Sequence, residues 1–267
     1  MKKFILAFSI VLLATLVASS TEASHSWGPY HWARSANPLS LKLGDNLSST
    51  SWKAHLATAS TDWTASSVLD TAIVLGTALR HRSSQKDCSP VNGTVQVCNK
   101  TYGNNGWLGL AQIWISGSHI TQGVAKMNDT YFNLAKYNNP NEKLHVVCQE
   151  VGHTFGLDHQ SEDGTSQNTC MDYFSNTGAN AESTLSTHPN AHDYAQLETI
   201  YAHLDVLSPT PTTKNGNGNG NGNIIVDLND PSAWGKAVRQ DARGNNSLYE
   251  LDLGNGNKLF TFVTWAE

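Results

Sequence analysis

Some short stretches of the chain alternate between apolar and polar residues, and others repeat at helical spacing. Residues 39–43 alternate strictly and residues 68–75 are largely apolar, two patterns typical of strands. Residues 51–63 lie between them with the spacing of an amphipathic helix, and a capping residue is available at positions 49–51. Strands interleaved with helices predict an α/β fold.

The middle of the chain predicts two more strands and a long helix. Residues 107–115 are strand-like, residues 117–118 give a turn, and residues 119–128 form a second extended stretch. The sequence Asn-Pro-Asn-Glu at 139–142 resembles a capping box with proline at the first helical position. We expect a helix that begins there and runs to about Phe155.

Composition divides the rest of the chain. Residues 208–223 are rich in proline and threonine and then repeat Asn-Gly, which predicts a flexible linker between a main domain at 24–207 and a small segment at 224–267. Residues 248–253 and 258–265 alternate on either side of a Gly-Asn-Gly-Asn turn, so the segment is expected to be β. A segment this short has little core of its own, and we expect it to dock on the main domain, a partner or another copy.

Residues 1–23 have the layout of a secretory signal peptide. Two lysines precede an apolar run at 4–17, and small residues follow. About 14 apolar residues are too few to span a bilayer comfortably, so we expect secretion to an extracellular or periplasmic space and no stable membrane anchor. The net charge of -5 over 267 residues argues against nucleic acid as a partner.

The segment from Gln149 to His159 has the spacing H-E-x-x-H-x-x-G-x-x-H, with glutamine in place of the first histidine. Residues four apart share a helix face, so Gln149 and His153 can converge on one metal ion while Glu150 lies one step round. His159 lies about 240° further round the helix than His153, so the helix must end between them. Gly156 can end it, because glycine adopts the left-handed conformation without steric cost.

Met171 and Tyr173 follow this segment as Met-x-Tyr. With that element the chain resembles the metzincin zinc metallopeptidases, in which a methionine turn lies beneath the metal. The Gly-Leu-Asp-His ending of the long motif is most like the matrixin branch, whereas Met-x-Tyr is more like the astacin and serralysin branches. The resemblance covers mainly residues 107–173 and more weakly 38–207. It implies a mixed sheet with an active-site helix.

The resemblance implies Zn²⁺ as the cofactor and gives each motif residue a role. His153 and His159 would be metal ligands, and Glu150 would move protons as the catalytic base and acid. Met171 would form the floor beneath the metal. Tyr173 would stabilise the oxyanion of the reacting carbonyl.

The third metal ligand stays open. Gln149 can coordinate through its amide oxygen as a weak ligand, His188, His192 or His203 can complete the site instead, or the chain is an inactive descendant. His145 shares the helix face but lies about 12 Å from the second motif histidine along the helix, too far to share one ion.

The four cysteines are even in number and permit three pairings in an oxidising compartment. Cys88 and Cys98 flank an Asn-Gly turn signal, so we expect a local bridge across a hairpin. Cys148 and Cys170 then pair and tie the motif helix to the methionine turn. The alternative is that one of this second pair ligates the metal.

Gly109, Leu110 and Ala111 occupy the place where metzincins have an edge strand that pairs with the substrate main chain. An ordinary buried strand has the same pattern. We therefore expect a secreted zinc-dependent endopeptidase that acts on a protein or peptide substrate. The alternative is a non-catalytic extracellular binding protein on the same fold.

Overall fold

The computed structural model describes residues 25–77, 88–206 and 227–266. The expected signal peptide and linker lie outside these residues. Among the described residues, no helix is both long and apolar enough to cross a membrane.

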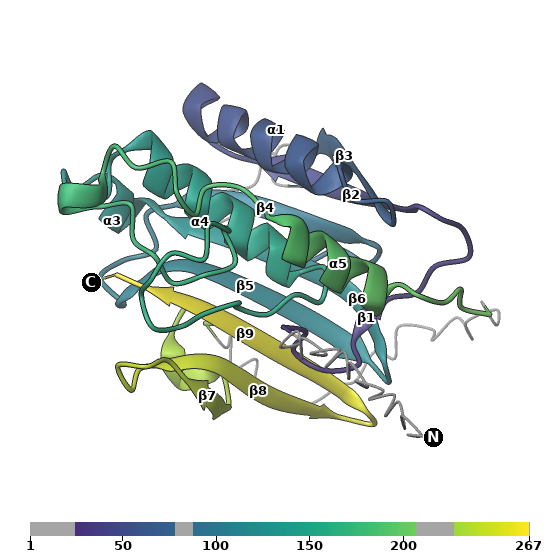
Figure 1. The fold of residues 1–267 in the computed structure, drawn as a ribbon. Helices are drawn as coiled ribbons and strands as arrows, with labels where there is room; N and C mark the ends of the chain where they lie inside the picture. Colours follow the sequence, from purple (N-terminus) through teal and green to yellow (C-terminus); the bar gives the residue numbers. More distant parts are fainter. Residues whose placement is uncertain (1–24, 78–87, 207–226, 267) are drawn as a thin grey trace, which may run out of the picture.

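One mixed sheet of nine strands dominates the described part of the chain (Figure 1). Its order is β3-β2-β4-β6-β5-β9-β8-β7, with β1 paired to β6 beside this path. Strands β1 to β4 and β6 pair with one another in parallel, whereas the pairs β6–β5, β5–β9, β9–β8 and β8–β7 are antiparallel. The strands are β1 (His31–Trp32), β2 (Leu39–Asn46), β3 (Leu69–Leu75), β4 (Thr94–Lys100), β5 (Trp107–Ser116), β6 (His119–Asn128), β7 (Lys236–Gln240), β8 (Asn246–Gly254) and β9 (Asn257–Trp265).

The longer helices cover one face of this sheet (Figure 1). They are α1 (Thr50–Thr64), α4 (Pro140–His153) and α5 (Ala191–Ile200), and the short α3 (Asp129–Phe132) follows β6. Two 3-10 turns lie at Gly178–Asn180 and Pro231–Ala233. The expected α/β class with a mixed sheet is therefore confirmed.

Local sequence signals fix both ends of α4. The Asn139 side chain accepts a hydrogen bond from Glu142 N at 2.8 Å, which satisfies one of the free N–H groups of the first turn. The Glu142 carboxylate accepts from Asn176 N at 2.6 Å and ties the helix to a later loop. At the other end Gly156 has φ +103, in the left-handed region, and the chain leaves the helix axis there. The helix ends at His153, two residues before the expected Phe155.

The expected hairpin around Asn92 and Gly93 is wrong. Within the described residues, 88–93 form no strand, and β4 pairs in parallel with both β2 and β6. The Cys88–Cys98 bridge is present, and it joins the chain before the turn to β4 rather than the two arms of a hairpin. A turn signal reports only the local reversal of the chain, and the sheet decides which strands pair.

The C-terminal residues 227–266 extend the same sheet. β9 pairs antiparallel with β5 along nearly its full length, and β8 and β7 follow as a meander. Residues before β7 cross the other face, where Leu228 O accepts hydrogen bonds from the Gln112 amide and the Trp234 indole at 2.8 and 2.9 Å. β7 was not expected from the sequence.

The two largest hydrophobic clusters of the described residues lie on opposite faces of the sheet. The larger one fills the space beneath the helices, and its members include Leu43, Leu56, Trp63, Met127, Val147, Val151, Phe260 and Phe262. The smaller one consists of Trp107, Leu110, Trp234, Tyr249 and Val263. Successive residues of a strand point to opposite faces, so β9 contributes to both clusters.

Candidate functional site

The last turns of α4 place the motif residues in the interior. Gln149, Glu150 and His153 are completely buried, and His159 is 8% exposed. The turn at Gly156 brings His159 back, so that its Nε2 lies 2.9 Å from His153 Nε2. The expected convergence of the two histidines is thus present in the structure.

The other nitrogen of each ring has its own acceptor. His153 Nδ1 lies 2.9 Å from Leu157 O, and His159 Nδ1 lies 2.7 Å from Glu162 Oε1. These partners assign the N–H to Nδ1 in both rings and leave both Nε2 lone pairs facing the same point. Metal-bound histidines have this arrangement, with the second nitrogen held by a carbonyl or carboxylate. Burial, followed by the neighbouring His159, lowers the pKa of His153 well below its usual value.

Gln149 lies one turn before His153, and both ends of its amide are hydrogen-bonded to protein. Nε2 donates to Asp172 O at 2.7 Å, and Oε1 accepts from the Thr264 hydroxyl at 2.6 Å. An amide oxygen has two lone pairs, so one of them is left for another partner.

The other histidines considered as a third ligand have different partners. His188 pairs with Asp62 at 2.6 Å on α1. His203 pairs with Asp205 at 3.5 Å, and His192 stacks on His25 with ring centroids 4.6 Å apart. His145 is buried, and its Nε2 donates to Asp172 O at 3.0 Å.

Glu150 is the buried acid of the site. Its Oε1 lies 2.7 Å from the Thr264 hydroxyl, which shares its single proton between this oxygen and Gln149 Oε1, and its Oε2 has no hydrogen-bond partner among the described residues. Burial raises the pKa of Glu150 to about 8, although the bond from Thr264 acts in the opposite direction. A Cβ at Gly109 would lie 2.4 Å from Glu150 Oε1, so only glycine fits at that position of β5.

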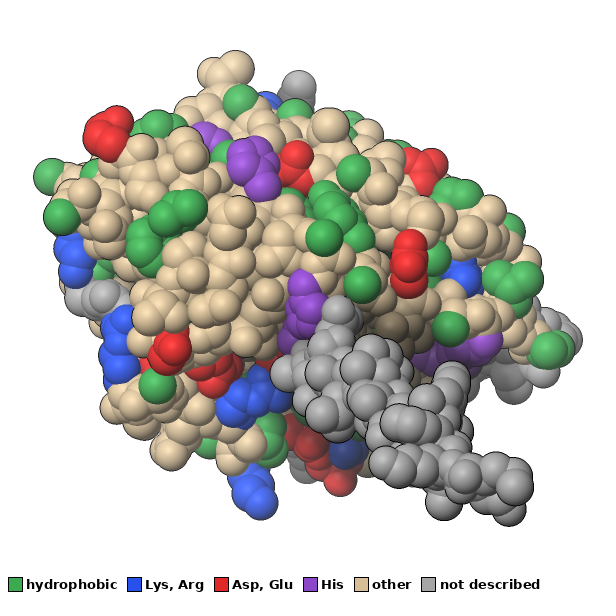
Figure 2. Space-filling model, in the orientation of Figure 1, with side chains coloured by type: hydrophobic (Ala, Val, Ile, Leu, Met, Phe, Trp, Pro, Cys, Tyr) green, Lys and Arg blue, Asp and Glu red, His purple; other side chains and the backbone are tan. Residues whose placement is uncertain are grey.

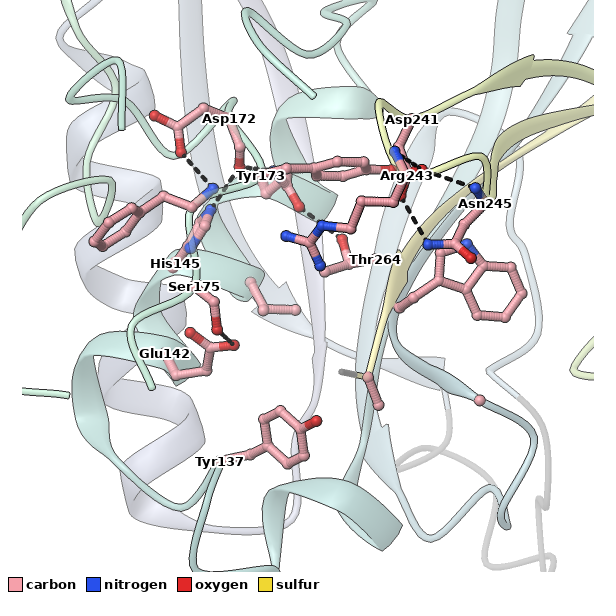
Figure 3. A pocket seen from close by; sticks show the side chains of 16 residues that line it. Tyr137, Glu142, His145, Asp172, Tyr173, Ser175, Asp241, Arg243, Asn245 and Thr264 are labelled. Atoms are coloured by element: carbon pink, nitrogen blue, oxygen red, sulfur yellow. Dashed lines mark hydrogen bonds between the residues drawn. The ribbon is translucent and has the colours of Figure 1, made fainter. Parts of the chain in front are cut away.

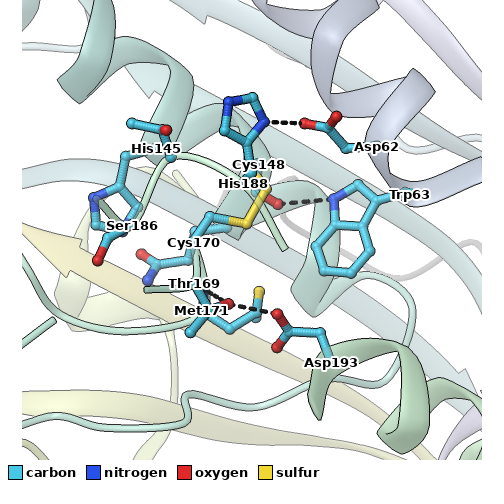
Figure 4. The surroundings of a disulfide bond; sticks show 12 residues. Asp62, Trp63, His145, Cys148, Thr169, Cys170, Met171, Ser186, His188 and Asp193 are labelled. Atoms are coloured by element: carbon cyan, nitrogen blue, oxygen red, sulfur yellow. Dashed lines mark hydrogen bonds and ion pairs between the residues drawn. A yellow bond between two sulfur atoms is a disulfide. The ribbon is translucent and has the colours of Figure 1, made fainter. Parts of the chain in front are cut away.

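The Cys148–Cys170 bridge joins α4 to the segment that carries Met171 (Figure 4). The Met171 side chain packs against Gly152 of α4, where a Cβ would come within 2.6 Å of its Sδ. The Trp63 indole donates to Cys148 O at 3.2 Å, which holds α1 against the same helix. The methionine turn therefore lies directly beneath the motif helix.

Tyr173 packs against the candidate metal ligands. Its ring centroid lies 4.3 Å from that of His159. Burial raises the pKa of Tyr173 well above its usual value, so the hydroxyl remains a hydrogen-bond donor. It donates to Val263 O at 2.8 Å. The acceptor belongs to β9, in the C-terminal segment.

β9 lies where a substrate strand was expected. Its residues Phe262, Val263 and Thr264 pair antiparallel with Ala111, Leu110 and Gly109 in that order. β5 is therefore no edge strand in this structure. The Phe262 ring stacks on the His153 ring, with centroids 4.1 Å apart and planes 13° apart.

A second contact anchors the C-terminal segment beside the site. Arg239 of β7 forms an ion pair with Asp158 and lies 3.9 Å from Glu162. Asp158, His159 and Glu162 each offer a ligand atom within 4.8 Å of the others, and the guanidinium already supplies a positive charge to this group. Sequence reasoning missed Arg239, Phe262 and Thr264, because no local pattern links them to the motif.

A cavity of about 300 Å³ lies beside Gln149 (Figure 3). α4 forms one wall with Glu142 and His145, and the loop between β7 and β8 forms another with Asp241 and Arg243. The cavity adjoins the site on the side of Thr264, and neither His153 nor His159 lines it.

Comparison with known proteins gives only distant likenesses. No protein-family model matches the chain, and no curated protein sequence matches it. Among solved structures it is similar to high choriolytic enzyme 1, a hatching enzyme zinc-protease from Oryzias latipes (medaka fish), with 11% identity and a TM-score of 0.35 over 64% of this chain and 94% of that one. Myroilysin is similar at 11% identity and a TM-score of 0.36, over 64% of this chain and 96% of that one. TM-scores this low carry no weight for the activity, which depends on the residues of this chain.

Proposed function

We propose that the chain is a zinc-dependent endopeptidase whose peptide groove is occupied by its own C-terminal strand. The peptide group between Val263 and Thr264 carries the proposal. Its carbonyl accepts from Tyr173, and the Thr264 hydroxyl donates to Glu150. The two groups expected to act on a scissile peptide thus contact one extended strand, which pairs with β5 as a substrate would.

The donor set fits a zinc ion. Two buried imidazoles with converging Nε2 lone pairs are the nitrogen ligands that zinc prefers, and Gln149 would add a neutral oxygen. Zinc bound there would polarise the substrate carbonyl and lower the pKa of water.

Glu150 and Tyr173 would supply the remaining chemistry. With the strand displaced, Glu150 would lose the burial that raises its pKa in the closed chain, take a proton from water and pass it to the leaving amine. The Tyr173 hydroxyl would donate to the carbonyl oxygen as negative charge develops on it. The Val263 carbonyl at 2.8 Å marks where such an oxygen would lie.

The substrates we infer are unfolded or extended segments of proteins. Main-chain pairing with β5 recognises backbone more than side chains, and an extended strand is the form that fits. The two disulfides suit an oxidising compartment, in agreement with the signal-like N-terminus.

A cleavable linker tests the proposal. A recognition sequence for a site-specific protease can replace residues 215–222, which belong to the Asn-Gly repeat. After cutting, the C-terminal fragment is held by non-covalent contacts alone, so it dissociates on dilution. We expect the specific activity of the cut, zinc-loaded chain on a quenched extended peptide to rise as the protein is diluted. The uncut chain should not respond to dilution.

Glu150→Gln is the matched control for the cut chain. It keeps the size of the side chain and removes the proton carrier, so the cut variant should bind zinc and remain silent at every dilution. If the cut chain with Glu150 intact is also silent, the endopeptidase proposal fails.

Two observations favour a non-catalytic binding protein instead. The Gln149 amide is held by two protein hydrogen bonds, and the strand over the site is part of the hydrophobic core. In that case the cut chain would recapture its C-terminal fragment and bind other extended peptides without cutting them. A fluorescent peptide with the sequence of 257–265 would measure that binding.

A further inference from the structure

Three histidines and one aspartate that are not part of the motif meet at one corner of the sheet. His31 is on β1, His119 begins β6, and His203 and Asp205 follow α5. The Nε2 atoms of the three histidines lie 3.3, 3.1 and 3.5 Å from the same oxygen, Asp205 Oδ1. His31, His203 and Asp205 each offer a ligand atom within 4.8 Å of the others.

We propose that His31, His203 and Asp205 form a second metal site, suited to Zn²⁺ or another divalent first-row metal, and that the partly exposed ring of His119, which contacts Asp205 alone among these ligand atoms in the described structure, completes it. Three imidazole nitrogens and one carboxylate oxygen are a donor set that zinc takes in tetrahedral geometry. Ligand atoms about 2.0–2.1 Å from a tetrahedral zinc lie about 3.3 Å from one another. The three nitrogen–oxygen distances are close to that separation.

The hydrogen bonds of His31 favour a cation at this place. His31 Nδ1 lies 3.0 Å from Pro29 O, which assigns the N–H of the neutral ring to Nδ1. Nε2 is then an acceptor, and it faces Asp205 Oδ1, another acceptor. A proton on Nε2 or a metal ion satisfies both atoms, and with a metal ion the Pro29 carbonyl takes the part of the outer partner that orients metal-bound histidines.

The three histidine nitrogens around Asp205 Oδ1 also favour a metal ion. A carboxylate oxygen has about two lone-pair positions, which His31 and His119 already face, and His203 Nε2 at 3.5 Å makes no hydrogen bond to this oxygen. A metal ion would instead accept one lone pair from each of the four side chains.

The buried side chain of Arg34 holds the segment that carries two of these ligands. Its Nε donates to His203 O at 3.1 Å, and a further N–H donates to Tyr201 O. Its backbone N–H donates to Asp205 Oδ2 at 2.8 Å, and Asp205 N donates back to Arg34 O at 2.7 Å. Asp205 Oδ1 is therefore fixed in place and left for the histidines.

The cluster is accessible to an ion. His119 and His203 have 40% and 56% of their side chains exposed, while His31 and Asp205 are about one-tenth exposed. Figure 2 shows that histidine side chains reach the surface at several separate places on the face drawn. A metal here would tie β1, the start of β6 and the chain leaving α5 to one another.

Metal counting in the full chain tests this site. Apo-protein is loaded with Zn²⁺ or Co²⁺ alone and dialysed, and bound metal per chain is measured for the parent, His203→Ala and Asp205→Asn. We expect each variant to hold one metal fewer than the parent. Loss of a ligand should weaken affinity by more than the roughly 10- to 100-fold that loss of an outer partner costs.

His188→Ala is the matched control. His188 also pairs with an aspartate, Asp62, and is 51% exposed, but it lies outside the cluster. It should keep the metal content of the parent, and the tetrahedral Co²⁺ absorption of the parent should weaken only in the two cluster variants. Circular dichroism checks that every variant is folded. Equal metal content and affinity in the parent and His203→Ala would overturn the proposal, whatever the motif site binds.

Discussion

Phe262 is the residue through which the C-terminal strand covers the candidate site most closely. Its ring is fully buried, stacks on His153 at 4.1 Å and meets Trp27 edge-on at 5.7 Å. Replacing a buried phenylalanine by alanine costs about 3–5 kcal/mol. In Phe262→Ala most of this lost free energy should weaken the docking of β9, because the rings that contact Phe262, those of His153 and Trp27, lie outside the C-terminal segment.

The expected gain in activity follows from this loss. Each 1.4 kcal/mol is a factor of ten in an equilibrium, so the fraction of molecules with an open groove should rise roughly 10²- to 10³-fold. Hydrolysis of a quenched extended peptide by the zinc-loaded full chain should rise in proportion until opening no longer limits the rate. Adding Glu150→Gln to the same chain should abolish the gain.

Phe132→Ala controls for a general loss of stability. Phe132 is 1% exposed and packs on Trp52, with ring centroids 4.9 Å apart, in α3. The substitution removes the same ring from the core without touching β9. If both variants are folded, unfold at similar temperatures and hydrolyse the peptide equally, β9 does not control access and the reasoning is refuted.

Three further predictions concern the motif helix. The pKa of Glu150 is about 8 in the folded chain and 4.5 in the free group, so the folded chain keeps a proton that the unfolded chain loses between these pH values. The stability of the parent therefore falls as the pH rises from 5 to 8, whereas that of Glu150→Gln does not. In denaturant titrations with chelator, the unfolding free energy of Glu150→Gln should increase by roughly 4 kcal/mol relative to the parent over this range. Gln149→His should raise zinc affinity by about 10-fold or more in chelator competition, because an imidazole replaces a neutral oxygen one turn before the next ligand. Replacing Cys148 and Cys170 by alanine removes a disulfide between cysteines 22 residues apart in the sequence. Chemical denaturation should show an unfolding free energy about 3 kcal/mol lower than that of the parent.

Each of these has a result that would contradict it. A parent and a Glu150→Gln variant with parallel pH profiles would mean that the carboxyl ionises freely in the folded chain. Equal zinc affinities would mean that position 149 does not face the metal. Unchanged stability without the bridge would mean that packing alone holds the methionine turn to α4.

Local rules determined the elements that carry the motif. Asn139 caps α4 and Gly156 ends it with φ +103, as the residue types require. Spacing of four along that helix put Gln149 and His153 on one buried face, and the turn brought His159 to His153. These predictions hold because helix periodicity and glycine conformation depend on neighbours within a few residues.

The tertiary structure decided which strands pair. The alternating pattern of 258–265 predicted a strand but not its neighbour, because the main-chain hydrogen bonds that join strands carry no sequence code. In the structure this strand, β9, pairs with β5. In the same way the Asn-Gly turn at 92–93 predicted a hairpin, whereas β4 pairs in parallel with β2 and β6.

Contacts between distant segments could not be predicted either. His31, His119 and Asp205 meet only because β1 pairs with β6 and the chain after α5 returns to that corner of the sheet. The Glu150 carboxylate likewise meets Thr264 through strand pairing, and its raised pKa follows from burial beneath that strand. Sequence fixes which groups a chain carries and its local turns, whereas packing fixes which of those groups lose contact with water and which face one another.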